Sequence, residues 1–320
     1  MEAGRDDVAR LQAGARECGC GGFLAGLAPT ARGELFTALV FDRLKRKMRC
    51  VGELRRETGE DWPRTFYLLY FRTLSDLRNQ ETYLRLARLV PYKAVLRERQ
   101  APRAVEAMLL GASGLLDLYE VDDYTLALRR SFEHLAAKYG IEPMPPDAWK
   151  LQGLRPANHP VLRIAQAAAF FVQDEFVMAR AMACADENDV RKLFCIDAPE
   201  YWSSHALPGL ADSGKPRRLG SFKAHIIGIN LVAVLQFAYG TYTGRDALRD
   251  HALTLLERLS AEENRYVAAW RDRGLRPADA FATQALLQLS TEYCAPASGA
   301  PRGADCPVGR RILQEVRKSR

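Results

Sequence analysis

The sequence predicts an all-α fold, a compact assembly of roughly ten or more helices with no substantial sheet. Three observations support this prediction. Apolar residues recur at helical spacing along most of the chain, as in residues 35–48. Helix-start and helix-stop signals separate these segments. No run of alternating β-branched residues is long enough to indicate a strand, and there is no fixed-period repeat of the solenoid kind.

Composition indicates an ordinary globular protein. Its 320 residues suffice for one large domain or two smaller ones, and 48% of them are hydrophobic and 27% charged. We expect a poorly ordered or linker-like segment at 1–30 and a single helical domain over 31–320. The net charge of +7 fits an acidic partner, although a solvated basic surface gives the same composition.

The cysteines and the apolar segments indicate a cytoplasmic protein. Seven cysteines are present, an odd number at irregular spacing, and the charged first residues contain no apolar signal core. The most apolar window, 226–239, contains Asn230 and Gln236 and is too short for a bilayer. We therefore expect a reducing compartment and no membrane partner.

The first half of the chain begins its helices with clear signals. The basic residues of 43–49 occupy the other face of the helix that carries the apolar stripe of 35–48. Asp61, followed by tryptophan and proline, predicts a helix start. Residues 103–116 predict a helix that ends in small residues. Gly111 and Gly114 there indicate either close approach of another helix or loss of the helix at its end.

The middle of the chain is divided by prolines. Asp122 and Asp123 predict the start of a helix that runs to Tyr139 and ends at Gly140. A proline-rich corner follows near 143–160, which we interpret as a turn within one domain. Residues 160–182 predict a long, central apolar helix. The polar, glycine-containing loop near 207–219 is expected to be mobile.

The last third predicts further helices and contains one more helix-start signal. Two are expected at about 221–239 and 244–259, and Ser260 with Glu263 matches a capping box. Asp279 should begin an amphipathic helix ending near 293. A loop at 295–305 and a basic helix at about 307–318 complete the predicted elements.

The most informative polar segment is 149–166, which leads from prolines into the apolar helix. It supplies candidate nucleic-acid or anion ligands: Lys150, Arg155, Asn158, His159, Arg163 and Gln166. Arginine forks onto phosphate oxygens, and a helix N-terminus favours an anion. The alternative is structural, with the arginines paired to buried carboxylates such as Glu106 and with Asn158 capping the helix.

Evidence for catalytic or metal chemistry is sparse. The sequence lacks phosphate-binding glycine loops, dinucleotide fingerprints and the HExxH and GxSxG motifs. His205 is a candidate general base, although a histidine hydrogen-bonded within a helical core is the competing interpretation. Cys294 and Cys306 are candidate ligands for zinc or an iron–sulfur cluster, but a closed site needs four ligands, and the sequence favours two free thiols near the terminus.

Ordered sequence matches identify a family resemblance. They include residues 59–62 with 66–67, residues 106–116, the segment 154–166, residues 201–202 with His205, residues 237–240, and residues 284–294. From about Cys20 to Arg317 the chain resembles a bacterial family of unknown function found mostly in Bacteroidota. The polar family-motif residues are Glu106, Trp202 and His205.

The resemblance implies a nuclease context. Full-length members carry a preceding β-rich segment that looks like the acidic metal site of restriction-endonuclease-like nucleases, and nothing here matches it. We therefore expect the helical half alone, from a truncated reading frame or a split gene. The family's C-terminal pattern usually has three cysteines. Cys294 and Cys306 match the first and the last, and the middle one has no counterpart here, so Cys184 or Cys195 would have to replace it.

Together these observations favour a non-catalytic, basic, helical domain that binds DNA or RNA in association with a nuclease-like activity, which a separate chain could carry. The alternative is a protein-interaction or scaffold domain that packs on such a separately encoded partner. On its own the chain is not expected to be an enzyme, because the nuclease-like segment is missing. A self-sufficient enzyme using His205 and a carboxylate is the remaining possibility.

Overall fold

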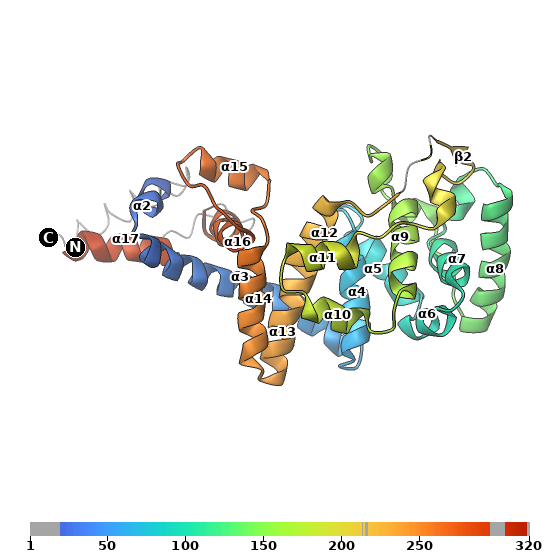
Figure 1. Ribbon diagram of the computed structural model, residues 1–320, viewed down its shortest axis with the longest axis horizontal. Helices are drawn as coiled ribbons and strands as arrows, with labels where there is room; N and C mark the ends of the chain where they lie inside the picture. Colours follow the sequence, from blue (N-terminus) through green and yellow to red (C-terminus); the bar gives the residue numbers. More distant parts are fainter. Residues whose placement is uncertain (1–19, 213, 215–216, 295–304, 319–320) are drawn as a thin grey trace. The chain divides into compact units, whose positions relative to one another are not determined.

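The computed structural model describes residues 20–212, 214, 217–294 and 305–318, and almost all of its regular elements are helices (Figure 1). The first elements are α2 (Gly21–Gly26), α3 (Pro29–Glu57), α4 (Trp62–Leu74), α5 (Gln80–Leu89), α6 (Tyr92–Glu98), α7 (Pro102–Ala112), η1 (Leu115–Leu118) and α8 (Asp123–Tyr139). Next come η2 (Pro146–Ala148), η3 (Pro156–Asn158), α9 (Pro160–Val172), α10 (Val177–Ala183), α11 (Glu187–Phe194), η4 (Glu200–Ser203), β1 (His205–Leu207) and β2 (Leu210–Ala211). The last are α12 (Ser221–Ile227), η5 (Gly228–Val232), α13 (Ala233–Thr243), α14 (Asp246–Arg258), α15 (Arg265–Arg271), α16 (Ala280–Gln288), η6 (Leu289–Cys294) and α17 (Pro307–Lys318).

The predicted all-α class is confirmed. Among the described residues, the named strands form a single two-stranded antiparallel sheet, in which β1 pairs with β2. This hairpin overlaps the beginning of the segment near 207–219 predicted to be a mobile loop. Residues 213, 215 and 216 of that loop lie outside the described part of the chain.

Two compact units emerge from the contacts within the chain. One comprises Met1–Cys50 and Phe237–Arg320, and the other is Val51–Gln236. Helices α3 and α13 contribute residues to both units. The expectation of a single domain over 31–320 stays a prediction, and within the segment 1–30 residues Gly21–Gly26 form α2.

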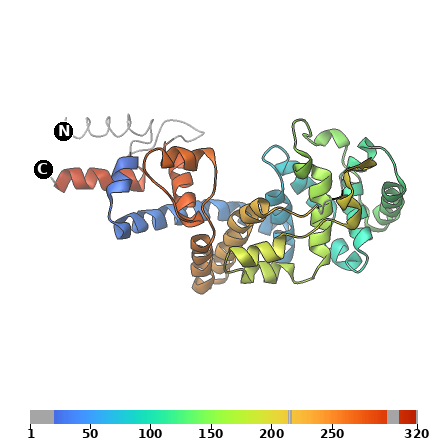
Figure 2. The same cartoon turned by 45° about the horizontal axis from the view of Figure 1, so that its top comes forward.

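Helix α9 forms the centre of the unit Val51–Gln236. All but two of its thirteen residues are buried. Its Phe170 stacks on Tyr70 of α4 with ring centroids 4.5 Å apart, and Phe171 stacks on Phe71 at 6.0 Å. Offset and stacked aromatic pairs stabilise a core beyond their buried area. Helix α7 lies between α9 and α8 (Figures 1 and 2).

Both interpretations of the small residues at the end of α7 are correct, each at a different glycine. Gly111 faces α8, where a Cβ atom would lie 2.1 Å from the ring of Phe132. Gly114 has a φ of 71°, and a Cβ there would lie 2.1 Å from the carbonyl oxygen of Met144. Gly111 therefore permits close packing of α7 and α8, and Gly114 ends the helix in the left-handed conformation.

In the other unit, α3 is joined to α16 by buried polar groups. Arg43 donates its Nε to Gln284 Oε1 at 2.6 Å, and Lys47 donates to the same oxygen at 2.9 Å. The amide of Gln284 donates in turn to Glu262. Burial lowers the pKa of Arg43 to about 10 and the pKa of Lys47 well below its usual range. Part of the basic run at 43–49 is therefore structural.

Most predicted helix boundaries agree with the structure. Asp61, Asp122 and Asp279 each cap a helix by accepting a backbone N–H, and Gly140 ends α8 in the left-handed conformation. Two predictions are wrong. The helix predicted over 160–182 is broken into α9 and α10, and the capping box at 260–263 starts no helix. Asn264 caps α15, because its side chain accepts two backbone N–H groups.

The stretch Ser221–Thr243 is one continuous helical run that contains a π-helical segment, η5. Among the described residues it is the one helix long and apolar enough to cross a membrane by length and composition. Within its apolar window, 72% of the residues are buried inside the protein. Burial of that extent is typical of a core helix.

The contact between α7 and α8 generates a stability prediction. Gly111→Ala should lower the free energy of unfolding by about 2 kcal/mol or more, because the new methyl overlaps a ring in a packed core. Gly33→Ala is the control, since a Cβ on that α3 glycine meets nothing within 4 Å. This control should be neutral or stabilising by up to about 1 kcal/mol. Chemical unfolding of both variants measures the difference, and equal midpoints would contradict the packing described.

Candidate functional site

The polar segment 149–166 is fixed to the unit Val51–Gln236 at several points. Trp149 donates its indole N–H to the carbonyl of Ser113 at 2.8 Å. The side chain of Asn79 both accepts from the backbone N–H of Lys150 at 2.8 Å and donates to its carbonyl at 3.1 Å. These bonds hold the loop after α4 against the loop before α9.

His159 caps α9. Its Nδ1 accepts the backbone N–H of Val161 at 3.3 Å, so in the neutral ring Nε2 carries the proton, and this atom lies 2.9 Å from the hydroxyl of Tyr119. Burial lowers the pKa of His159 to about 4. The ring is therefore neutral near pH 7, and its role in this arrangement is to begin α9 rather than to supply positive charge.

Arg163 is the central residue of the candidate site. Its side chain is buried, with the residue 8% exposed, on the first turn of α9. One terminal nitrogen donates to Gln166 Oε1 at 3.0 Å, and the other donates to Asn158 Oδ1 at 2.8 Å. Both acceptors are neutral amides. Burial lowers the pKa of Arg163, whereas the nearby phenols of Tyr83 and Tyr70 raise it.

A second, half-buried cation lies close enough to Arg163 to interact with it. Lys223 of α12 donates to the carbonyl oxygens of Thr73 and Ser75 at 2.7 and 2.8 Å. Burial and then the charge of Arg163 lower the pKa of Lys223 to about 7, while Asp76 acts in the opposite direction. The charge of this amine is therefore only partly compensated.

Exposed cations lie on the same loops. Lys150 and Arg155 are exposed, and the described part of the chain shows no hydrogen bond or ion pair of either side chain. Arg78 is also exposed and donates to the carbonyl of Gln152 at 3.0 Å. We call these residues together the α9 basic surface: Arg78, Lys150, Arg155, Arg163 and Lys223. The carboxylate of Asp76 lies beside these cations and accepts the backbone N–H groups of residues 78 and 79.

The structure brings most of the predicted segment together. Asn158, Arg163 and Gln166 form one hydrogen-bonded group, and Gln166 also donates to the carbonyl of Arg217 at 2.9 Å. The structural alternative is wrong in two details. Asn158 does not cap α9, because His159 does, and Arg163 is not paired with Glu106.

Two residues of the surface were missed in the sequence. Arg78 and Lys223 come from loops and helices far from 149–166 along the chain, and no local motif marks them. The basic loop before α12 is the nearest signal, yet its Arg217 and Arg218 form ion pairs with Asp212 and Asp197.

The family-motif residues form a separate polar cluster. Glu106 is buried, accepts the indole N–H of Trp202 at 2.6 Å and accepts the hydroxyl of Tyr124 at 2.5 Å. Burial raises the pKa of Glu106. Tyr201 stacks between Tyr124 and the ring of His205, with centroids 4.0 Å from each.

Among the described residues, the ring of His205 hydrogen-bonds to a carbonyl and a hydroxyl rather than to a carboxylate. Its Nδ1 lies 3.0 Å from the carbonyl oxygen of Tyr201 and 3.1 Å from the hydroxyl of Ser204. In the described part of the chain no carboxylate hydrogen-bonds to this ring; nearby Asp122 instead accepts from Tyr201. This arrangement gives no support to a catalytic pair of His205 and a carboxylate.

The candidate metal ligands Cys294 and Cys306 are both buried. Burial raises the pKa of the Cys306 thiol, and the neighbouring Cys20 thiol raises it further. Among the described residues there is no group of three or more histidine, cysteine, aspartate or glutamate side chains that could hold a metal ion. A metal at Cys294 and Cys306 therefore stays a prediction without a visible ligand set.

Comparison with known proteins identifies one relationship. The family described as "Protein of unknown function (DUF2851)" matches residues 3–265, which is well over half of the chain. No curated protein and no solved structure gives a significant match.

The buried cap of α9 generates a pH prediction. Burial lowers the pKa of His159 from its ordinary value of 6.5 to about 4. The neutral ring therefore contributes stability at pH values above 6.5, and this contribution is lost as pH falls from 6.5 to 4. Asparagine can still cap the helix but does not titrate. The variant His159→Asn should therefore lose less stability over that pH range. Parallel stability profiles of the two proteins in urea unfolding would contradict the assignment.

Proposed function

The chain belongs to the DUF2851 family, and we propose that it binds nucleic acid through phosphate contacts at the α9 basic surface. The observation that carries the proposal is the buried guanidinium of Arg163, which is held by two amide oxygens and has Lys223 as its charged neighbour. Phosphate contacts of arginine and lysine dominate the affinity of proteins for nucleic acid.

A buried cation is costly unless an opposite charge compensates it. In proteins this charge usually comes from a carboxylate, yet the polar contacts of Arg163 are neutral amides. An anionic ligand would supply the missing compensation. Phosphate oxygens suit this role, because a guanidinium can donate two parallel hydrogen bonds to them.

Asn158 connects the buried arginine to the surface. Its side chain is exposed, and its Oδ1 accepts from Arg163. The exposed Lys150 and Arg155 lie on the same short stretch of chain. They add long, flexible cations that can follow a phosphate backbone, so the surface combines one fixed cation with a mobile rim.

The family resemblance supplies a context for this binding. In the proposal, the helical domain gives nucleic-acid affinity to a nuclease-like activity carried by another segment or by a separate chain. Phosphate contacts carry no sequence information, so the domain would position the substrate without selecting a sequence.

One observation favours a second function, that of a protein-interaction domain. Three large apolar side chains, Leu118, Val121 and Leu210, are 45%, 50% and 56% exposed. The turn before β2 lies against the segment that carries Leu118 and Val121, because a Cβ on Gly209 would lie 2.9 Å from the carbonyl oxygen of Glu120. An apolar surface of this kind fits a partner protein rather than a phosphate backbone.

The proposal predicts salt-sensitive binding to labelled single- or double-stranded DNA or RNA. Lys150→Ala combined with Arg155→Ala should weaken binding at low salt by about tenfold and reduce the slope of log K against log salt by about 2. Fluorescence anisotropy across a salt series measures both quantities.

The matched control is Arg130→Ala, which removes an exposed arginine from α8, outside the surface. Its affinity and salt slope should equal those of the unaltered protein. Binding that is absent at low salt, or that is equally weakened by the control, would contradict the proposal. Absence of binding would favour the protein-interaction function instead.

Lys223 adds a prediction about pH. Its pKa of about 7 means that the amine loses its proton as pH rises from 6 to 9, whereas a bound phosphate favours the protonated form. Affinity should therefore fall several-fold over that range in the unaltered protein. Lys223→Met keeps the apolar stem without the charge, so its affinity should be lower and nearly independent of pH. An identical pH profile in both proteins would show that this lysine does not contact the ligand.

A further inference from the structure

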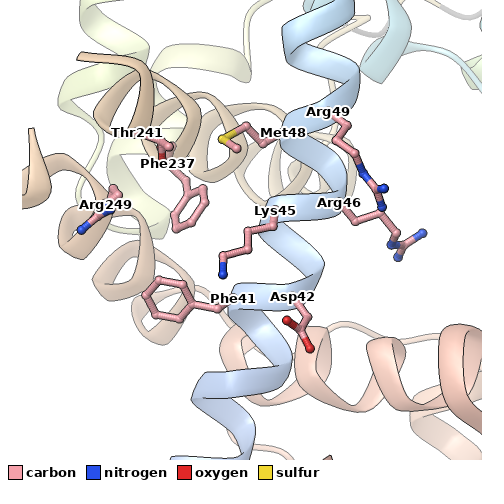
Figure 3. Close-up of a pocket in the computed structure, with 9 residues that line it drawn as sticks. All are labelled: Phe41, Asp42, Lys45, Arg46, Met48, Arg49, Phe237, Thr241 and Arg249. Carbon is pink, nitrogen blue, oxygen red and sulfur yellow. The ribbon is translucent and has the colours of Figure 1, made fainter. Parts of the chain in front are cut away.

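A pocket of about 450 Å³ opens beside α3 in the unit made of Met1–Cys50 and Phe237–Arg320. Its walls come from α3, α13 and α14 (Figure 3). The volume falls within the range of about 300–1,000 Å³ that is usual for small-molecule sites. The site lies outside the α9 basic surface and shares no residue with it.

Positive charge surrounds this pocket. Four cationic side chains line it, namely Lys45, Arg46, Arg49 and Arg249. Arg46 pairs with Glu292 at 2.9 Å, and Arg249 pairs with Asp246 at 2.9 Å. Lys45 and Arg49 are exposed, and the described residues offer neither of them an ion-pair partner. The pocket therefore keeps two cations available to an anion.

The base of the pocket is apolar and partly aromatic. Phe41 is half-buried and packs edge-on against the buried ring of Phe237, with centroids 5.6 Å apart. The thioether of Met48 completes this surface. Figure 3 shows the amino group of Lys45 on the same side of α3 as the two rings, whereas the guanidinium groups of Arg46 and Arg49 lie beside one another on the other side of the helix.

One carboxylate also lines the pocket. Asp42 accepts the hydroxyl of Tyr293 at 3.2 Å through Oδ2. A carboxylate has two oxygens and about four acceptor positions. Asp42 can therefore accept a further hydrogen bond from the amino group of a planar base, while the cations bind an anionic group.

We propose that this pocket, the α3 pocket, binds a nucleoside phosphate. The half-buried Phe41 ring and Met48 contact the base, Asp42 accepts from its amino group, and Lys45 with Arg49 neutralises the phosphate. Aromatic stacking combined with nearby cations is the usual means by which proteins hold unpaired nucleotides. The ligand is either a free nucleotide or an unstacked nucleotide of a single strand, and both present the same groups.

The test uses the full chain and isothermal titration with three probes: AMP, inorganic phosphate and a single-stranded oligodeoxyadenylate. AMP should bind more tightly than inorganic phosphate. Lys45→Ala and Arg49→Ala should each weaken AMP about fivefold or more, as loss of a charge-assisted contact does. Phe41→Leu keeps the apolar volume but removes the stacking ring, and it should also weaken AMP about fivefold.

Arg56→Ala is the matched control, because it removes an exposed arginine from the same helix. It should leave AMP affinity unchanged. Binding of AMP alone assigns the free nucleotide, and binding of the oligonucleotide with loss in the Lys45 and Phe41 variants assigns the single strand. Equal affinity for AMP and inorganic phosphate, no binding of AMP or the oligonucleotide, or an equal effect of the control would overturn the proposal.

The proposals for the α9 basic surface and the α3 pocket can be contradicted separately. Loss of oligonucleotide binding in the variants at Lys150 and Arg155, with AMP binding intact, would leave the α3 pocket standing. Loss of AMP binding in the variants at Lys45 and Phe41, with the salt-sensitive binding intact, would identify the pocket as the separate nucleotide site.

Discussion

The burial of the Arg163 guanidinium between two neutral amides is the constraint on which the candidate site depends. Taking a permanent cation out of water costs several kcal/mol unless geometry and charge compensate it. The amides of Asn158 and Gln166 satisfy its hydrogen bonds but not its charge. Lys223 increases the imbalance, because its own charge acts on the same region. One of the two acceptors of Arg163, Asn158, is exposed, and we interpret the arrangement as a surface that would accept phosphate.

The rest of the unit explains how the arginine is held. Aromatic rings of α4 and α9 stack across the core and fix the position of α9. His159 then determines where this helix begins, and its neutral ring leaves positive charge to Arg163 and Lys223. The loops on either side are joined through the side chain of Asn79. The packed core thus holds Arg163 in one position, next to the exposed side chains of Lys150 and Arg155.

Local chemistry made most of the fold predictable, and long-range packing made part of the site unpredictable. Asp61, Asp122 and Gly140 act through bonds to near neighbours, so their effects can be read from the chain. Helix α9 could be recognised by its apolar run, but its end could not, because the break before α10 has no proline or glycine. Lys223 joins Arg163 only through the packing of α12, and the α3 pocket requires residues nearly two hundred positions apart.

The most direct test of the account is NMR of the arginine side-chain Nε–H groups during titration with a short oligonucleotide at low salt. Arg163→Lys and Arg155→Lys would assign the two signals. Both signals should shift as the oligonucleotide binds and return as salt is added, because the phosphate contacts are electrostatic. An Arg163 signal that stays unchanged while the oligonucleotide binds would show that the buried guanidinium is a structural strut and that the phosphate lies elsewhere.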